Sequence, residues 1–113
     1  MRMKTFLALY MAPVESFAEW MKMPPEQQKS GMEAWTTWMQ EHERSFVEEG
    51  AQLGTTTRVT AEGVSDVKNE IGGYSIVQAA SAKDAVKIFD DSPHLQMSGA
   101  WVELMECLPM PSP

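Results

Sequence analysis

The stretch "GYSIVQAASAKDAVKIF", residues 73–89, joins a strand pattern to a helix pattern and therefore decides the kind of fold. Residues 73–80 carry tyrosine, isoleucine and valine, which favour a strand. Ser81 then opens a helix, and Asp84 three residues later completes a start that resembles a capping box. Pro93 ends this helix. The stretch predicts a strand that leads directly into a helix, as in a β-α-β unit.

The rest of the chain surrounds this unit with further strands and helices. Strand patterns cover residues 4–11, 51–60, 73–80 and 99–108. Helix patterns cover residues 14–23, 26–49 and the segment from Ser81 to Pro93. Residues 61–72 form a polar connection of loop or hairpin type. The order predicts an α+β fold of the ferredoxin-like type, βαββαβ, with an antiparallel four-stranded sheet and helices on one face.

The other sheet face would still carry apolar side chains, and leaving them in water is costly. We therefore expect that face to meet a second copy of the chain, as a homodimer, or a small-molecule ligand. The longest helix runs from Glu26 to Glu49, because this segment has no proline and only one glycine, Gly31. Gly50 is predicted as its C-terminal cap.

Composition limits the function classes. A length of 113 residues predicts one domain, residues 1–113, with a loosely held proline-rich tail at 109–113. The net charge of −7 argues against a nucleic-acid partner. No apolar run approaches a membrane span, and the short N-terminal run is typical of a strand rather than of a signal segment. We therefore expect a cytoplasmic protein. No cofactor is predicted, because no glycine loop that could hold a phosphate precedes a helix. The single cysteine, Cys107, is expected to be a small buried residue.

His42 lies in the charged segment "WMQEHERSF", residues 38–46, yet helical geometry separates it from the charges. At roughly 100° per residue, Trp35, Trp38 and Phe46 fall within about 40° of His42, while the neighbouring glutamates point away. This excludes a simple surface histidine. Two interpretations stay open: a hydrogen-bonded core histidine, and a histidine at a cavity, where it would transfer protons.

A second polar cluster, "FDDSPHL", contains Asp90, Asp91 and His94 at the end of a helix. Carboxylates are disfavoured there, so a nearby cation such as His94 or Arg58 would be expected, and a solvated last turn is the alternative. A metal site from His42, His94 and Asp91 has no recognisable ligand spacing, and no metal is predicted.

Arg58 and Trp101 are candidate lining residues of a cavity between two subunits. An arginine that points into an apolar barrel would select a carboxylate or enolate oxygen, whereas an outward one would only help solubility. Side-chain alternation alone does not choose between these.

Three stretches together resemble the YCII-related family: "GMEAWTTWMQEHERSFVEEGAQLGTTTRV" (31–59), "GGYSIVQAASAKDAVKIFDDSPHL" (72–95) and "VELMECLPMP" (102–111). The resemblance implies a ferredoxin-like fold that pairs as a dimeric α+β barrel. It also implies an active site in which a histidine on the long helix, matched by His42, pairs with an acidic residue before a proline. Here Ser92 precedes Pro93 and Asp91 stands one residue earlier. The family's frequent "DGPF" motif is replaced by "SDVKNEIGG".

The sequence therefore predicts a YCII-related protein of unassigned physiological role. It would bind a small apolar or aromatic molecule in a barrel cavity, with His42 as general acid or base and Asp91 as its orienting partner. The ligand-binding residues would be Trp35, Trp38, Arg58, His94 and Trp101. The alternatives are a non-catalytic binding or regulatory module and a purely structural dimer.

Overall fold

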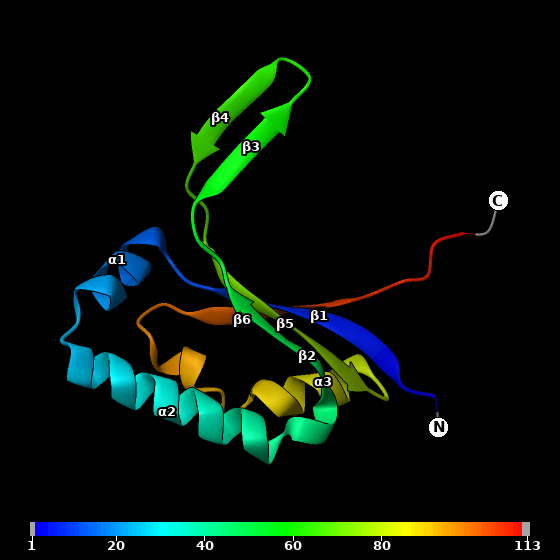
Figure 1. The fold of residues 1–113 in the computed structure, drawn as a ribbon. Coiled ribbons are helices and arrows are strands. Elements are labelled where there is room, and N and C mark those ends of the chain that lie inside the picture. Colours follow the sequence, from blue (N-terminus) through cyan, green and yellow to red (C-terminus); the bar gives the residue numbers. More distant parts are fainter. Residues whose placement is uncertain (1, 112–113) are drawn as a thin grey trace.

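The computed structural model of the chain describes residues 2–111, and its main feature is one antiparallel sheet (Figure 1). The end of the predicted tail, residues 112–113, lies outside the described part. The main sheet has the order β2-β5-β1-β6 and consists of β1 (Lys4–Met11), β2 (Phe46–Gln52), β5 (Ile71–Ala79) and β6 (Trp101–Glu106). A second, two-stranded sheet consists of β3 (Thr56–Thr60) and β4 (Gly63–Val67).

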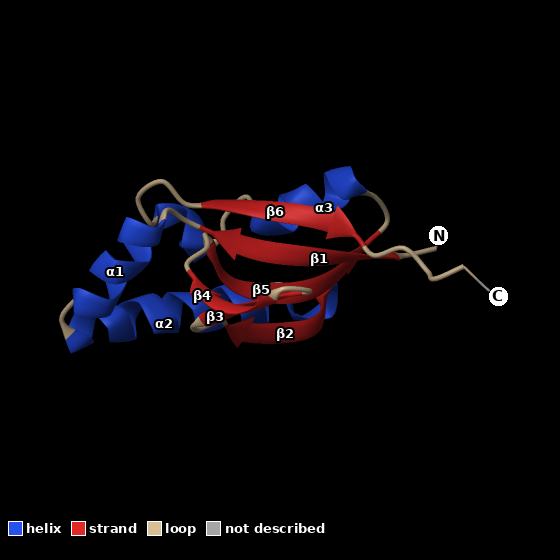
Figure 2. Cartoon of the chain, turned by 90° about the horizontal axis from the view of Figure 1, so that it is seen from above, coloured by secondary structure: helices blue, strands red, loops and turns tan. Residues whose placement is uncertain are grey.

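The helices are α1 (Val14–Lys22), α2 (Pro25–Glu41) and α3 (Ala82–Phe89), with short 3-10 turns η1 (Glu43–Ser45) and η2 (Pro93–Gln96). Helices α2 and α3 lie on one face of the main sheet, α1 lies beyond one of its ends, and the other face is open, as Figure 2 shows from the open side. The predicted α+β class and the antiparallel four-stranded sheet are confirmed. The predicted start of α3 is also confirmed, because the Ser81 side chain accepts a hydrogen bond from the Asp84 backbone N–H at 3.2 Å.

The core lies between the sheet and the helices. Side chains alternate between the two faces of a strand, so every second residue of β1 and β5 faces the helices. The buried hydrophobic set is Phe6, Ala8, Tyr10, Trp38, Val77, Ala79, Ala85, Ile88 and Phe89. Trp35, Met39 and Phe46 pack against it from α2 and β2. Burying an aromatic side chain of this size stabilises a fold by about 2–3 kcal/mol, so α2 is held mainly by its aromatic stripe.

The predicted helix over 26–49 is wrong in its last two turns. The helix ends at Glu41, His42 is its C-cap residue, and Phe46–Gln52 is an edge strand paired with β5. Gly50 is not a helix cap but lies in an irregular part of β2 with a φ of 84°. A Cβ atom there would lie 1.8 Å from the Tyr74 carbonyl oxygen, so only glycine fits.

The predicted strand 51–60 is divided between two sheets. Its first residues end β2, and Thr56–Thr60 forms β3, which pairs with Gly63–Val67 rather than with the main sheet. The connection 61–72 therefore contains a strand, which agrees with the hairpin alternative. This hairpin projects from one end of the main sheet (Figure 1).

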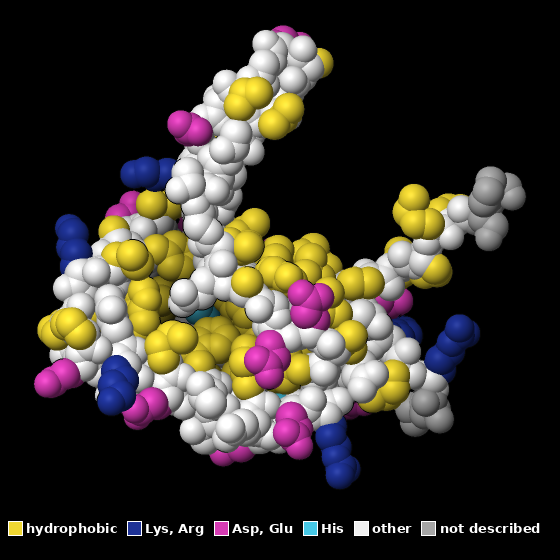
Figure 3. Space-filling model, viewed as in Figure 1, with side chains coloured by type: hydrophobic (Ala, Val, Ile, Leu, Met, Phe, Trp, Pro, Cys, Tyr) yellow, Lys and Arg dark blue, Asp and Glu magenta, His cyan; other side chains and the backbone are white. Residues whose placement is uncertain are grey.

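The open face of the sheet is apolar at its centre. Leu7 lies directly between Ile76 of β5 and Met105 of β6, and Leu9 lies beside Tyr74. These side chains are half-buried or exposed. Figure 3 shows hydrophobic side chains gathered over this face, between the hairpin and the C-terminal segment.

Within residues 2–111, none of the helices combines the length and the apolar character that crossing a membrane would require.

Candidate functional site

His42 lies where α2 ends, on the side of the helix that carries Trp38. The backbone N–H of His42 still contacts the Trp38 and Met39 carbonyls, and the chain then turns through η1 into β2. Its imidazole packs against the Trp38 indole, with 5.8 Å between ring centroids. The His42 side chain is 26% exposed, so it is neither a free surface group nor a closed core residue.

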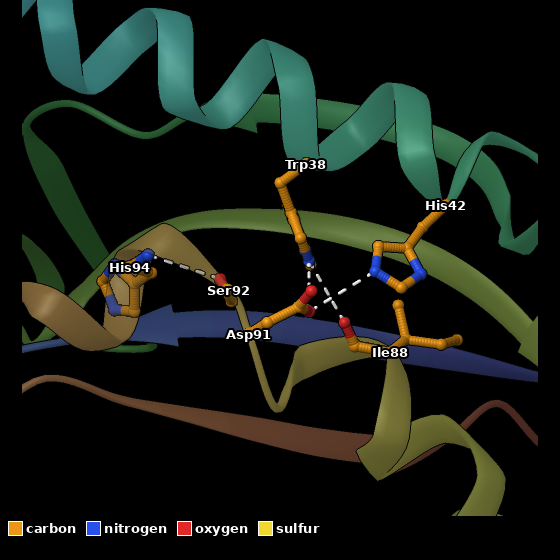
Figure 4. Close-up of polar contacts among 6 residues, drawn as sticks. All are labelled: Trp38, His42, Ile88, Asp91, Ser92 and His94. Carbon is orange, nitrogen blue, oxygen red and sulfur yellow. Dashed lines mark hydrogen bonds and ion pairs between the residues drawn. The ribbon is translucent and has the colours of Figure 1, made fainter.

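Asp91, which we expected to orient His42, lies beside it. The His42 Nε2 atom lies 3.4 Å from Asp91 Oδ1, an ion-pair distance (Figure 4). The same oxygen accepts a hydrogen bond from Trp38 Nε1 at 3.2 Å. That indole N–H is shared with the Ile88 carbonyl oxygen, also at 3.2 Å. The buried tryptophan therefore fixes the carboxylate, and the carboxylate in turn faces one nitrogen of the imidazole.

Two helix ends meet at this pair. His42 follows α2, and Asp91 follows α3 by two residues, so each contributes the partial negative charge of a helix C-terminus. Glu41 and Asp90 add negative charge, and the last turn of α2 holds no basic residue. The imidazole of His42 is the group that faces Asp91 here. The cations expected beside the aspartates lie elsewhere, since His94 is bonded to the Met11 carbonyl and Arg58 is on the hairpin.

His94 is placed quite differently from His42. It lies buried in η2, and its Nε2 contacts the Met11 carbonyl oxygen at 2.7 Å. Because a carbonyl only accepts hydrogen bonds, Nε2 carries the ring proton. Burial lowers the pKa of His94 from its usual value, and contacts to the Met11 and Trp101 backbone partly oppose this. Figure 4 shows His94 apart from the His42–Asp91 pair.

An aromatic cluster joins His94 to the core. Tyr10 is in edge contact with Trp35 and His94, with centroid distances of 4.7 and 5.4 Å. The Tyr10 hydroxyl shares a hydrogen bond of 2.8 Å with Ser75, whose hydroxyl donates to the Glu49 carbonyl oxygen. Burial raises the pKa of Tyr10 to about 12, although the bond with Ser75 acts in the opposite direction. Tyr10 therefore stays a neutral hydroxyl and serves the core.

Arg58 and Trp101 lie away from the His42–Asp91 pair. Arg58 is exposed on β3 of the projecting hairpin. Trp101 begins β6, and its Nε1 donates to Glu103 Oε2 at 2.8 Å. Of the predicted ligand-binding residues, the structure brings Trp38 directly to the pair, places Trp35 and His94 in the aromatic cluster, and leaves Arg58 and Trp101 elsewhere.

One group of three potential metal ligands exists within residues 2–111. It consists of Glu41, His42 and Asp91, whose ligand atoms all lie within 4.8 Å of one another. The combination considered from the sequence, with His94 as a ligand, does not form, because His94 is bonded to the backbone. Both carboxylates of the group are exposed.

Two surface concavities lie outside this pair. The larger, about 360 Å³, lies between α1 and the base of the hairpin and is lined largely by apolar side chains, among them Phe17, Trp20, Leu53 and Ile71, with Lys68 also at its wall. The smaller, about 210 Å³, lies between α3 and β6. Neither lining includes His42 or Asp91.

Three features of the site escaped the sequence. Trp38 was predicted as a ligand contact, but its hydrogen bond to Asp91 depends on the meeting of α2 and α3. Ser92 is buried and caps η2 by accepting a hydrogen bond from the His94 N–H, a role that depends on the fold around η2. Cys107, expected to be buried, is exposed, because the chain leaves the sheet at that residue.

A scan of the sequence against models of protein families finds no match. A search of curated proteins likewise finds no matching relative. The resemblance to the YCII-related family therefore stays a prediction that rests on the quoted motifs.

Proposed function

We propose that the chain is a YCII-related, ferredoxin-like protein that pairs through its open sheet face as a homodimeric α+β barrel. It handles a small apolar or aromatic molecule that carries a polar oxygen. His42 acts as general acid or base, and Asp91 orients its imidazole.

The contact of Trp38, Asp91 and His42 carries this proposal. A carboxylate that faces Nε2 keeps the proton of a neutral imidazole on that nitrogen, as in other acid–base pairs. The lone pair is then on Nδ1, the nitrogen that points away from Asp91 in Figure 4. Nδ1 would take a proton from a carbon next to a carbonyl group and return it, while Asp91 stabilises the imidazolium formed in between.

The sheet supports the fold and the dimer in the proposal. Strand β5 separates β1 from β2, and β1 separates β5 from β6. This order supports the ferredoxin-like arrangement that we propose. Pairing of the open face with a second copy would remove the apolar side chains around Leu7 and Leu9 from water.

A non-catalytic binding module is the second candidate, and the 360 Å³ concavity favours it. Its volume falls in the range of small-molecule sites, its wall is mainly apolar, and Lys68 provides a cation for an acidic ligand group. In that case ligand binding would not depend on His42.

Hydrogen exchange at carbon tests the catalytic proposal. We would incubate the protein with small aryl ketones in D₂O and follow loss of the proton next to the carbonyl by NMR. The expected result is exchange well above buffer, lost in His42→Gln and reduced in Asp91→Asn. A Glu43→Gln variant, which changes a neighbouring exposed carboxylate, is the matched control and should exchange normally. Exchange that persists in His42→Gln would overturn the role of His42.

The oligomeric state tests the dimer. Sedimentation equilibrium should give twice the chain mass of 12.7 kDa. A Leu9→Lys variant, which places a charge on the open face, should be monomeric, whereas Val86→Lys on the exposed side of α3 should remain dimeric. A monomeric wild-type protein would contradict the proposal.

A further inference from the structure

The β3–β4 hairpin is not supported by the rest of its own chain. Its two strands pair only with each other, and all but its first and last residues are exposed. A two-stranded hairpin alone is marginally stable in water. Its regular pairing from Thr56 to Val67 therefore points to a surface that is supplied by another molecule.

The hairpin carries one exposed apolar pair. Val59 and Val64 are direct partners across the two strands and share a face, and they are 74% and 69% exposed. Arg58 and Ser65 form the adjacent pair and lie on the opposite face. One side of the hairpin is thus apolar next to the turn and carries the Thr57–Asp66 pair nearer its base, and the charge of Arg58 lies on the other side.

The C-terminal arm, residues 107–111, presents a second unpaired apolar surface. The Cys107 N–H donates to the Thr5 carbonyl oxygen at 2.8 Å, and the chain then leaves the sheet. Leu108 and Met110 are 74% and 89% exposed. Pro109 has no N–H, so the arm cannot continue as a regular strand and would bind through its side chains.

These two projections make the chain extended. The radius of gyration is 15.9 Å, against about 13 Å expected for a compact domain of this length. The hairpin and the arm leave opposite ends of the sheet and frame the open face between them (Figures 1 and 3). Exposed apolar side chains thus lie on the hairpin, on the open face and on the arm.

We propose that the hairpin of one copy packs on the C-terminal arm of a second copy, with Val59 and Val64 against Leu108 and Met110. This rests on the face-to-face dimer of the proposed function. A two-fold axis that lies between the faces and runs across the strands brings each hairpin over the partner's arm. The contact occurs twice, buries side chains that a single chain leaves in water, and clamps both ends of the interface.

Cross-linking to the native Cys107 tests this arrangement. Cys107 is exposed at the base of the arm, and the hairpin of the same chain is at the other end of the sheet. In a Val64→Cys variant, a short bis-maleimide should therefore link the introduced hairpin thiol of one copy to Cys107 of the other and convert most chains into a covalent dimer. Ser65→Cys, on the opposite hairpin face, is the matched control and should link several-fold less, and wild type, with Cys107 alone, should not link.

Three results would overturn the proposal. Val64→Cys that links no better than Ser65→Cys, while sedimentation shows a dimer, would remove the hairpin contact and leave the face-to-face dimer. Linking that survives Cys107→Ser in the Val64→Cys background would place the hairpins on each other instead of on the arms. A monomer in sedimentation would remove both proposals.

Discussion

His42 and His94, the two histidines of the chain, lie on the same side of the sheet in contrasting surroundings. His42 stands at the end of α2, partly open to solvent, with a carboxylate as its polar partner. His94 is buried in η2, and its partner is the Met11 backbone carbonyl. A carboxylate stabilises the protonated ring, whereas burial disfavours it. The pairing partner and the access to water, rather than the residue type, separate the two histidines.

Replacing His94 should have the largest effect on stability. His94→Ala removes the bond to the Met11 carbonyl oxygen and opens a cavity beside Tyr10 and Trp35. We expect a loss of about 2–4 kcal/mol in the free energy of unfolding, measured by urea denaturation. A loss as small as that of a surface substitution would mean that His94 contributes no more to folding stability than His42, which would contradict the contrast drawn between them.

Trp38 connects the His42 region to the core, and changing it should have the next largest effect. Trp38→Phe keeps the aromatic packing but removes the N–H that bonds Ile88 and Asp91. We expect a loss of about 1–2 kcal/mol in the free energy of unfolding. Trp35→Phe, on the same stripe of α2 but only partly buried, is the control and should cost less. Equal losses would mean that the shared hydrogen bond contributes nothing.

The two regions also differ in how much the sequence could predict. The order of strands and helices followed from local patterns, and so did the start of α3 at Ser81, because capping is a local interaction. The orientation of His42 toward Trp38 was also predictable from helical spacing. The end of α2 was not. Phe46 falls on the helical stripe and the segment has no proline, so nothing local marks the break after Glu41.

Pairing of residues 46–52 with β5 explains why α2 ends after Glu41. Phe46 gains a place opposite Val77 in the sheet, and this non-local contact outweighs the helical preference of the segment. Gly50 was predicted as a helix cap, but whether it ends a helix or fits a strand irregularity depends on contacts such as that with the Tyr74 carbonyl. In the same way, the approach of Asp91 to His42 depends on two helix ends that are far apart in the sequence.

The pH dependence of stability should follow His94. Its pKa is lowered from 6.5 in the folded protein, so the unfolded chain binds a proton first as the pH falls. The stabilisation that comes from the neutral ring is fully present above the pKa of the unfolded state. It is lost as the pH falls from there through the lowered pKa of the folded state, by at most about 1.4 kcal/mol per pH unit. His94→Gln, which keeps an N–H donor, should show a shallower decline in the free energy of unfolding between about pH 7 and about pH 5. An unchanged decline would assign the effect to other groups.

Replacing His42 should have the smallest effect on stability. Its partner Asp91 is 61% exposed, so solvent screens the ion pair, and pairs of this kind contribute about 0–1 kcal/mol. His42→Ala should therefore leave the urea midpoint nearly unchanged while removing the proposed hydrogen exchange at carbon. The small stability loss and the large functional loss together define a proton carrier. A loss of several kcal/mol would instead make His42 a core residue like His94, since the alanine would then be removing packing against Trp38 rather than a reactive nitrogen.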